Sequence, residues 1–142
     1  MHLEIADRQR ELTVDTGIVW EALQTASQEE DRDASLSLAV VDDAEMRRLN
    51  DRYLAREGTT DVLSFGYGAG DGPVEAEIVA NASEAIRRAA SRAHSAHDEL
   101  LLYVVHGFLH AVGYDDLEPE PAARMHERER EILRRVDRPV ND

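Results

Sequence analysis

Alternating apolar and polar positions predict two strands in the first part of the chain, at residues 2–7 and 34–43. Between them, at 16–30, apolar residues recur every three or four positions, as they do on one face of a helix. The same spacing predicts a second helix at 44–54, with one of the two aspartates before it as the N-cap. The chain therefore begins with two strand–helix units.

A hairpin is predicted next. Residues 61–67 and 74–80 both have strand-like composition, and the glycine- and proline-rich stretch GAGDGP separates them. Because a connection this short joins strands that run in opposite directions, we expect at least one antiparallel strand in the sheet.

Three helices are predicted after the hairpin, at 83–94, 97–113 and 120–136. Asn81 and Glu84 have the spacing of a capping box at the start of the first of these helices. The helix at 97–113 is the most apolar of the chain, so it is expected to be buried on most sides.

This order of elements predicts a single α/β (α+β) domain over residues 1–142. We expect a mixed sheet of about four strands, one of them antiparallel, covered by about five helices with the helix at 97–113 in the centre. We find no internal repeat and no linker-like composition that would divide the chain.

The chain is strongly acidic, with 30 aspartates and glutamates against 16 lysines and arginines, and a net charge of −14. This balance argues against a broad basic surface, so a nucleic-acid substrate would need a local basic cluster or a bound cation. The lack of cysteine excludes disulfides and thiolate metal sites. With no basic and apolar leader and no run of about 18 apolar residues, a cytoplasmic protein without a membrane partner is expected.

The stretch HGFLHAVGYDD contains the candidate chemistry. His106 and His110 lie four residues apart on the predicted central helix, so both imidazoles can reach one ion about 2 Å away. Gly113 can end the helix and reverse the chain, which would bring Asp116 back as a third ligand. Three protein ligands leave one position open for water, as in catalytic zinc sites.

Other interpretations of the two histidines remain. They could be core residues with satisfied nitrogens, although Gly113 and Asp116 favour a metal site. The zinc-protease motif HExxH has the same histidine spacing and uses its glutamate as general base. Gly107 stands at that position here, which disfavours a peptidase unless another acid, such as Asp115, takes the role.

Two groups of arginines are interpreted as solvated helix faces, and in the second group acidic residues alternate with the arginines and can form salt bridges with them. The first group is Arg87, Arg88 and Arg92, and the second is Arg124, Arg128, Arg130, Arg134 and Arg135, interleaved with Glu127, Glu129 and Glu131. Asp61 and Ser64 are interpreted as residues that bond backbone groups around the third strand.

Four blocks of the chain resemble the YbeY family of bacterial rRNA maturation factors. HGFLHAVGYDD (106–116) is similar to the family signature H-G-x-L-H-L-x-G-Y-D-H, and LNDRYLAREGTTDVLSFGY (49–67) to its L-N-x-x-Y-R-x-K-D-x-P-T-D-V-L-S-F-P. EAEIVANASEAI (75–86) resembles the family's G-D-I-x-I-S strand and the helix after it, and MHEREREIL (125–133) its closing helix. The blocks follow the family order.

The resemblance implies a YbeY-like domain that is a metal-dependent, single-strand-specific endoribonuclease acting in rRNA maturation and ribosome assembly. It implies zinc or another divalent cation held by His106, His110 and Asp116, with Asp116 in place of the family's third histidine. Leu54 replaces a family arginine linked to RNA binding, so Arg56 becomes the candidate catalytic residue for a phosphate contact. Implied partners are single-stranded RNA, including rRNA, and ribosomal small-subunit proteins, with no DNA partner.

Two other functions fit parts of the same pattern. A non-catalytic ribosome-associated factor with a degenerate metal site would agree with Leu54, Asp116 and the acidic net charge. A metal-dependent hydrolase of a peptide or ester would share the three ligands, but Gly107 counts against peptide hydrolysis.

Overall fold

The structure is a computed structural model that describes residues 1–54, 59–67 and 70–140, and it has the predicted order of elements. Its strands are β1 (His2–Asp7), β2 (Ala34–Val41), β3 (Val62–Tyr67) and β4 (Val74–Asn81). Its helices are α1 (Thr16–Glu29), α2 (Asp43–Leu54), α3 (Ala82–Ala89), α4 (Ala96–Val112) and α5 (Pro119–Arg135). Over the described residues, no helix combines the length and apolar character that a membrane crossing requires.

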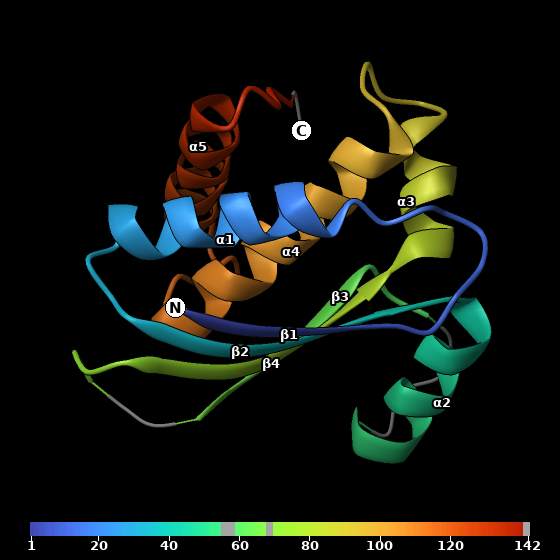
Figure 1. Cartoon of the computed structure of the whole chain (residues 1–142), viewed down its shortest axis with the longest axis horizontal. Coiled ribbons are helices and arrows are strands. Elements are labelled where there is room, and N and C mark those ends of the chain that lie inside the picture. Colours follow the sequence, from blue (N-terminus) through green and yellow to red (C-terminus); the bar gives the residue numbers. More distant parts are fainter. Residues whose placement is uncertain (55–58, 68–69, 141–142) are drawn as a thin grey trace.

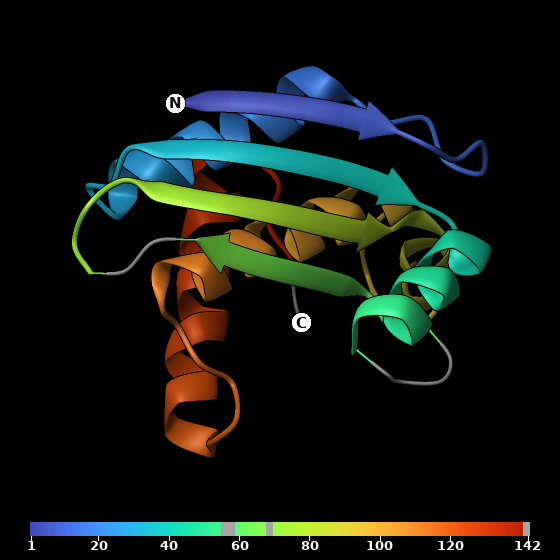
Figure 2. The same ribbon diagram turned by 90° about the horizontal axis from the view of Figure 1, so that it is seen from below.

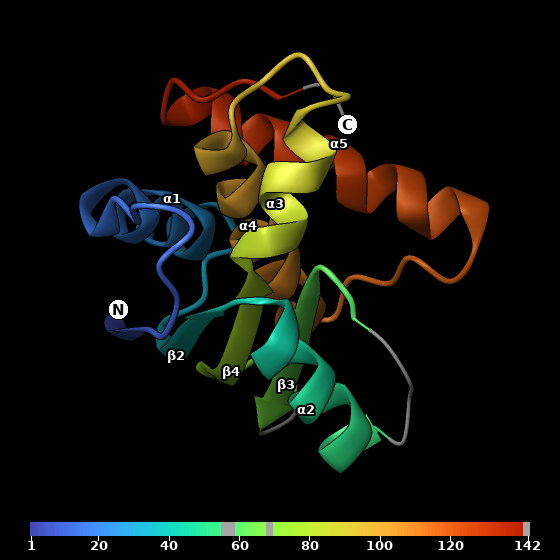
Figure 3. The same ribbon diagram turned by 90° about the vertical axis from the view of Figure 1, so that its right-hand side faces the viewer.

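The strands form one mixed sheet in the order β1-β2-β4-β3, which confirms the predicted fold class (Figure 2). Strands β1, β2 and β4 are parallel, and β3 pairs antiparallel with β4 because the turn between them reverses the chain. Helices α1, α3, α4 and α5 lie on one face of this sheet, whereas α2 lies beyond the opposite face (Figures 1 and 3). Most of the core therefore lies between the sheet and α4.

Helix α4 passes through the centre of the molecule, as its apolar composition predicted. Its side chains are buried from Glu99 to Leu109 except at His106, which is partly exposed. At Gly107 the helix approaches the sheet so closely that an added Cβ would lie 2.8 Å from Cγ2 of Ile78 and 3.2 Å from Cγ2 of Val62. The Ser64 hydroxyl donates to the Gly107 carbonyl at 2.7 Å, which fixes the same point of the helix against β3.

Helix α3 is shorter than predicted, since it ends at Ala89 and not near residue 94. Asn81 is its N-cap, because the side-chain oxygen accepts from the Ser83 amide at 3.0 Å and the Glu84 amide at 3.4 Å. The reciprocal contact of a capping box, from the backbone amide of Asn81 to the Glu84 side chain, does not form. That amide donates instead to the carbonyl of Asp61 at 2.8 Å. Beyond the helix, Arg92 turns toward a buried carboxylate on α4.

The contact at Gly107 predicts an unusual stability pattern. In Gly107→Ala the new methyl group overpacks against Ile78 at a cost of about 1–3 kcal/mol, which exceeds the roughly 1 kcal/mol that alanine gains over glycine in a helix. In an Ile78→Ala background the closest colliding atom is gone and only Cγ2 of Val62 remains, at 3.2 Å, so the same substitution should cost much less. Urea unfolding of the four proteins of this cycle measures the difference between the two costs.

Gly72→Ala is the matched control, because an added Cβ there meets no atom within 4 Å, and its effect should stay within about 0.5 kcal/mol. Equal destabilisation by Gly107→Ala in both backgrounds would contradict the close approach.

Candidate metal centre

Helix α4 ends at Val112, two residues after His110, and the geometry of this helix end places the third candidate ligand. Gly113 has a φ of 123°, a conformation that favours glycine, and its amide donates to the carbonyls of Leu109 and His110. The Tyr114 amide also donates to the Leu109 carbonyl, at 3.0 Å, which completes the helix end. The predicted glycine stop is therefore confirmed, and the chain turns back toward the helix.

The returning chain brings the Asp116 carboxylate to both imidazoles. Its Oδ2 lies 3.4 Å from Nε2 of His106, and its Oδ1 lies 3.3 Å from Nε2 of His110. One ligand atom from each of the three residues lies within 4.8 Å of the others. Donors about 2.0–2.1 Å from a tetrahedral zinc ion are separated by roughly 3.4 Å, so this arrangement could hold one such cation.

A fourth residue, Glu129 of α5, fixes the orientation of His106. The carboxylate of Glu129 is 1% exposed, and one oxygen contacts Nδ1 of His106 while the other lies 2.9 Å from Nδ1 of His126. Because an ionised carboxylate only accepts hydrogen bonds, both Nδ1 atoms carry the proton. In neutral His106 this leaves Nε2 as the free electron-pair donor, and it faces Asp116.

The electrostatic environment of His106 is dominated by these acids. Burial lowers the pKa of His106, but the hydrogen bond and charge of Glu129, together with the charge of Asp116, outweigh it. The pKa of His106 is therefore raised above its ordinary value, because the neighbouring carboxylates stabilise the protonated imidazole.

The interpretation of Glu129 as part of a solvated helix face with salt bridges was wrong. Met125, Glu129, Ile132 and Leu133 are all buried, and their spacing places them on one face of α5. A glutamate on the apolar face of an amphipathic helix was the available signal. A buried carboxylate requires a partner, and His106 and His126 supply it here.

We call the ligand atoms of His106, His110 and Asp116 the donor cluster. A cleft of about 320 Å³ adjoins it. It is lined by Asp61, Arg88, Arg92, Leu102, Tyr103, His106, Asp116, His126 and Glu129. Of the three arginines interpreted as a solvated face, Arg88 and Arg92 are only partly exposed and line this cleft. Arg87, the third of them, lies outside this lining and binds Asp43 instead.

The other candidate residues have structural contacts or lie elsewhere. Asp115 accepts from the Leu117 amide at 2.8 Å and lines a different hollow, so it does not join the donor cluster. Asp61 accepts from the Val62 amide at 2.7 Å, as predicted, but its other oxygen binds Arg88. Gly107 faces the sheet, so a glutamate there would not reach the histidines. Arg56 lies outside the described residues.

Sequence comparisons agree with the predicted resemblance. A family model described as Endoribonuclease YbeY matches residues 4–137. Proteins named Endoribonuclease YbeY from Rhodopirellula baltica and Anaeromyxobacter sp. are 40% and 38% identical over 80% and 72% of this chain. The matched regions span 59% and 54% of those two proteins. The namesake from Oceanobacillus iheyensis is 34% identical over 94% of this chain and 96% of its own length.

A solution structure from Thermotoga maritima shares the fold, with a TM-score of 0.65 and 24% identity over 94% of this chain and 88% of that one. The fold and the site together define an α/β protein in which two helical histidines and a returning carboxylate form a possible cation site. The chain belongs to the endoribonuclease YbeY family.

The buried contact of Glu129 predicts that Glu129→Gln weakens the binding of a divalent cation about 10- to 100-fold, because His106 loses the charged group that orients it. Zinc titration of the purified proteins, monitored by calorimetry, measures the change. Glu127→Gln is the matched control, since Glu127 is exposed on the same helix. Equal zinc affinity in the two variants would rule out an orienting role for Glu129.

Proposed function

We propose that this chain is a metal-dependent, single-strand-specific endoribonuclease that acts in rRNA maturation and ribosome assembly. The observation that carries the proposal is the convergence of His106, His110 and Asp116, whose ligand atoms lie within 4.8 Å of one another, in a chain of this family. The relatives named above also carry the name endoribonuclease.

The cation is proposed to be zinc, held by Nε2 of His106, Nε2 of His110 and the carboxylate of Asp116. Two neutral nitrogens and one oxygen are a donor set that zinc accepts, and the spacing of the donors suits its coordination. When bound, a divalent cation supplies positive charge for phosphodiester oxygens and acidifies water.

Each protein group then has a separate role. Glu129 holds His106 in the tautomer that presents Nε2. Asp116 carries a negative charge where a histidine would be neutral, so the cation and its ligands have a net charge of +1 and not +2. The carboxylate oxygen that replaces an imidazole nitrogen favours harder ions than an all-histidine site does. Arg56 stays a candidate for a phosphate contact.

The setting of the reaction follows from the same proposal. The substrate is single-stranded RNA, including rRNA, and the chain acts in the cytoplasm without a DNA or membrane partner. Ribosomal small-subunit proteins are proposed as partners, because such proteins are basic and this chain has a net charge of −14. The same charge favours the second candidate function, a ribosome-associated factor that does not cleave RNA.

Loss of a proposed ligand tests the central claim. His106→Ala should lower zinc affinity by more than about 100-fold, since even the loss of an orienting partner costs about 10- to 100-fold, and should reduce cleavage of single-stranded RNA to background. Elemental analysis and a fluorescent RNA cleavage assay measure the two effects. His97→Ala is the control, because His97 is exposed on the same helix. RNA cleavage by metal-free protein at the wild-type rate would refute the mechanism.

Substitutions of Asp116 test its effect on metal choice. Asp116→Asn keeps the shape but loses the charge, so it should weaken zinc and manganese together. Asp116→His should retain zinc and bind manganese more weakly, because imidazole suits zinc and carboxylate suits manganese. Competition titrations of the two metals report the ratio of affinities, and an unchanged ratio in Asp116→His would count against Asp116 as a ligand.

A further inference from the structure

We infer that Arg88 and Arg92 bind a phosphate of single-stranded RNA in the cleft beside the donor cluster, and that this binding requires the cation. The inference rests on the proposed function and adds to it the two residues that recognise the RNA backbone. Both arginines line the same cleft as His106 and Asp116. A phosphate in that cleft would therefore lie close to the proposed metal centre.

Arg88 is held in position but retains free hydrogen-bond donors. Its Nη1 donates to Oδ2 of Asp61 at 3.0 Å, and its guanidinium carbon lies 5.9 Å from the ring centroid of Tyr103. Its Nε is 3.8 Å from Glu84, beyond hydrogen-bonding distance. Among the described residues, no acceptor contacts its Nη2, and the side chain is 42% exposed. These donors are available to a ligand in the cleft.

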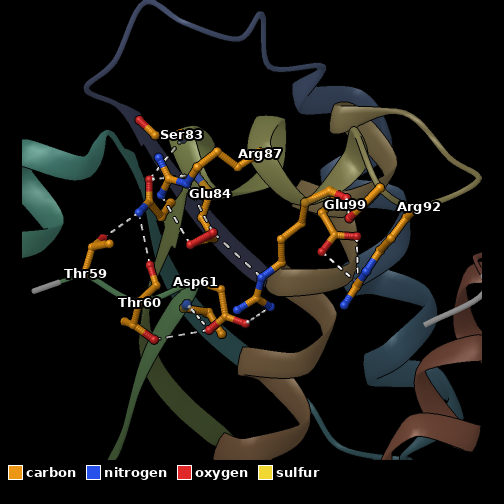
Figure 4. A network of polar contacts seen from close by, with 12 residues as sticks. Thr59, Thr60, Asp61, Ser83, Glu84, Arg87, Arg92 and Glu99 are labelled. Carbon is orange, nitrogen blue, oxygen red and sulfur yellow. Dashed lines mark hydrogen bonds and ion pairs between the residues drawn. The ribbon is translucent and has the colours of Figure 1, made fainter.

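Arg92 is fixed by a different carboxylate. Its Nη1 lies 2.9 and 2.8 Å from the two oxygens of Glu99, which is fully buried on α4 (Figure 4). His94 contacts the same carboxylate, so Glu99 is held from two sides. Within the described part of the chain, the contacts of Arg92 use only Nη1, which leaves Nε and Nη2 for a ligand. The pair is thus preorganised for the bidentate contacts that guanidinium groups make with phosphate.

The charges of the cleft make this binding conditional. Two arginines face the carboxylates of Asp61, Asp116 and Glu129 in the lining and that of Glu99, the partner of Arg92, which leaves two net negative charges when the histidines are neutral. An anionic phosphate is therefore repelled by the metal-free cleft. A divalent cation at Asp116 cancels these two charges, so cation and RNA should each strengthen the binding of the other.

The test is the binding of a short, fluorescein-labelled 2′-O-methyl RNA, which has no 2′-hydroxyl to attack its phosphodiester bonds, followed by anisotropy with zinc and with EDTA. Wild-type protein should bind the probe with zinc and at least about 10-fold more weakly in EDTA. Arg88→Gln and Arg92→Gln should each weaken binding with zinc by about 10-fold or more. Each should also reduce the slope of log affinity against log salt by about 0.7, which loss of fold stability alone would not do.

Arg87→Gln is the matched control, since Arg87 is the neighbour of Arg88 on α3 but binds Asp43 outside the cleft. It should bind the probe within about twofold of wild type, and all variants should bind zinc as wild type does. Wild-type probe affinity and salt slope in both Arg88→Gln and Arg92→Gln would overturn the inference. So would equal binding by wild type in zinc and in EDTA.

Cleavage of unmodified RNA by wild-type protein with zinc separates this inference from the proposed function. Cleavage together with unaltered probe binding in both arginine variants would overturn the inference alone. Zinc-dependent probe binding that needs both arginines, without any cleavage, would support the inference and refute the proposed activity.

Discussion

Close packing between α4 and the sheet is the constraint on which the site depends. At Gly107 the helix backbone approaches Ile78 and Val62 so closely that a single methyl group would collide, and Ser64 binds the carbonyl of the same residue. Because Gly107 faces the sheet, its neighbour His106 faces the cleft, and His110 follows one turn later. The helix is thus fixed in both depth and rotation, which decides where the two imidazoles point.

Two buried glutamates connect the core to the cleft. Glu99 and Glu129 are 0% and 1% exposed, and an unpaired carboxylate in such a position would cost several kcal/mol. Glu99 is paired with Arg92 and His94, and Glu129 with His106 and His126. Each buried acid therefore holds cleft-lining side chains in place, so the polar part of the core and the site form one network.

Periodicity was sufficient to predict the strands, the order of the helices and the antiparallel position of β3, because these depend on local pattern and on the turn chemistry of GAGDGP. The convergence of His106, His110 and Asp116 also followed from local rules, helix geometry and a glycine stop. The contacts of Glu129 with His106 and of Arg88 with Asp61 were not predicted, since these residues lie 23 and 27 positions apart in the chain. Helical periodicity also did not predict that α3 ends at Ala89 and that Arg92, beyond its end, binds Glu99 of α4.

The three donors all come from one stretch of chain, residues 106–116, closed by a single helix end. Closing so short a loop costs little chain entropy, so most of the ordering of the site is already achieved when α4 forms. The rest of the cleft is more dispersed, since besides Leu102 and Tyr103 of α4 it is lined by residues in or next to α3, α5 and β3. Apart from Glu129, which orients His106, side chains in those walls can therefore change without moving the three donors, because they belong to other elements of the fold.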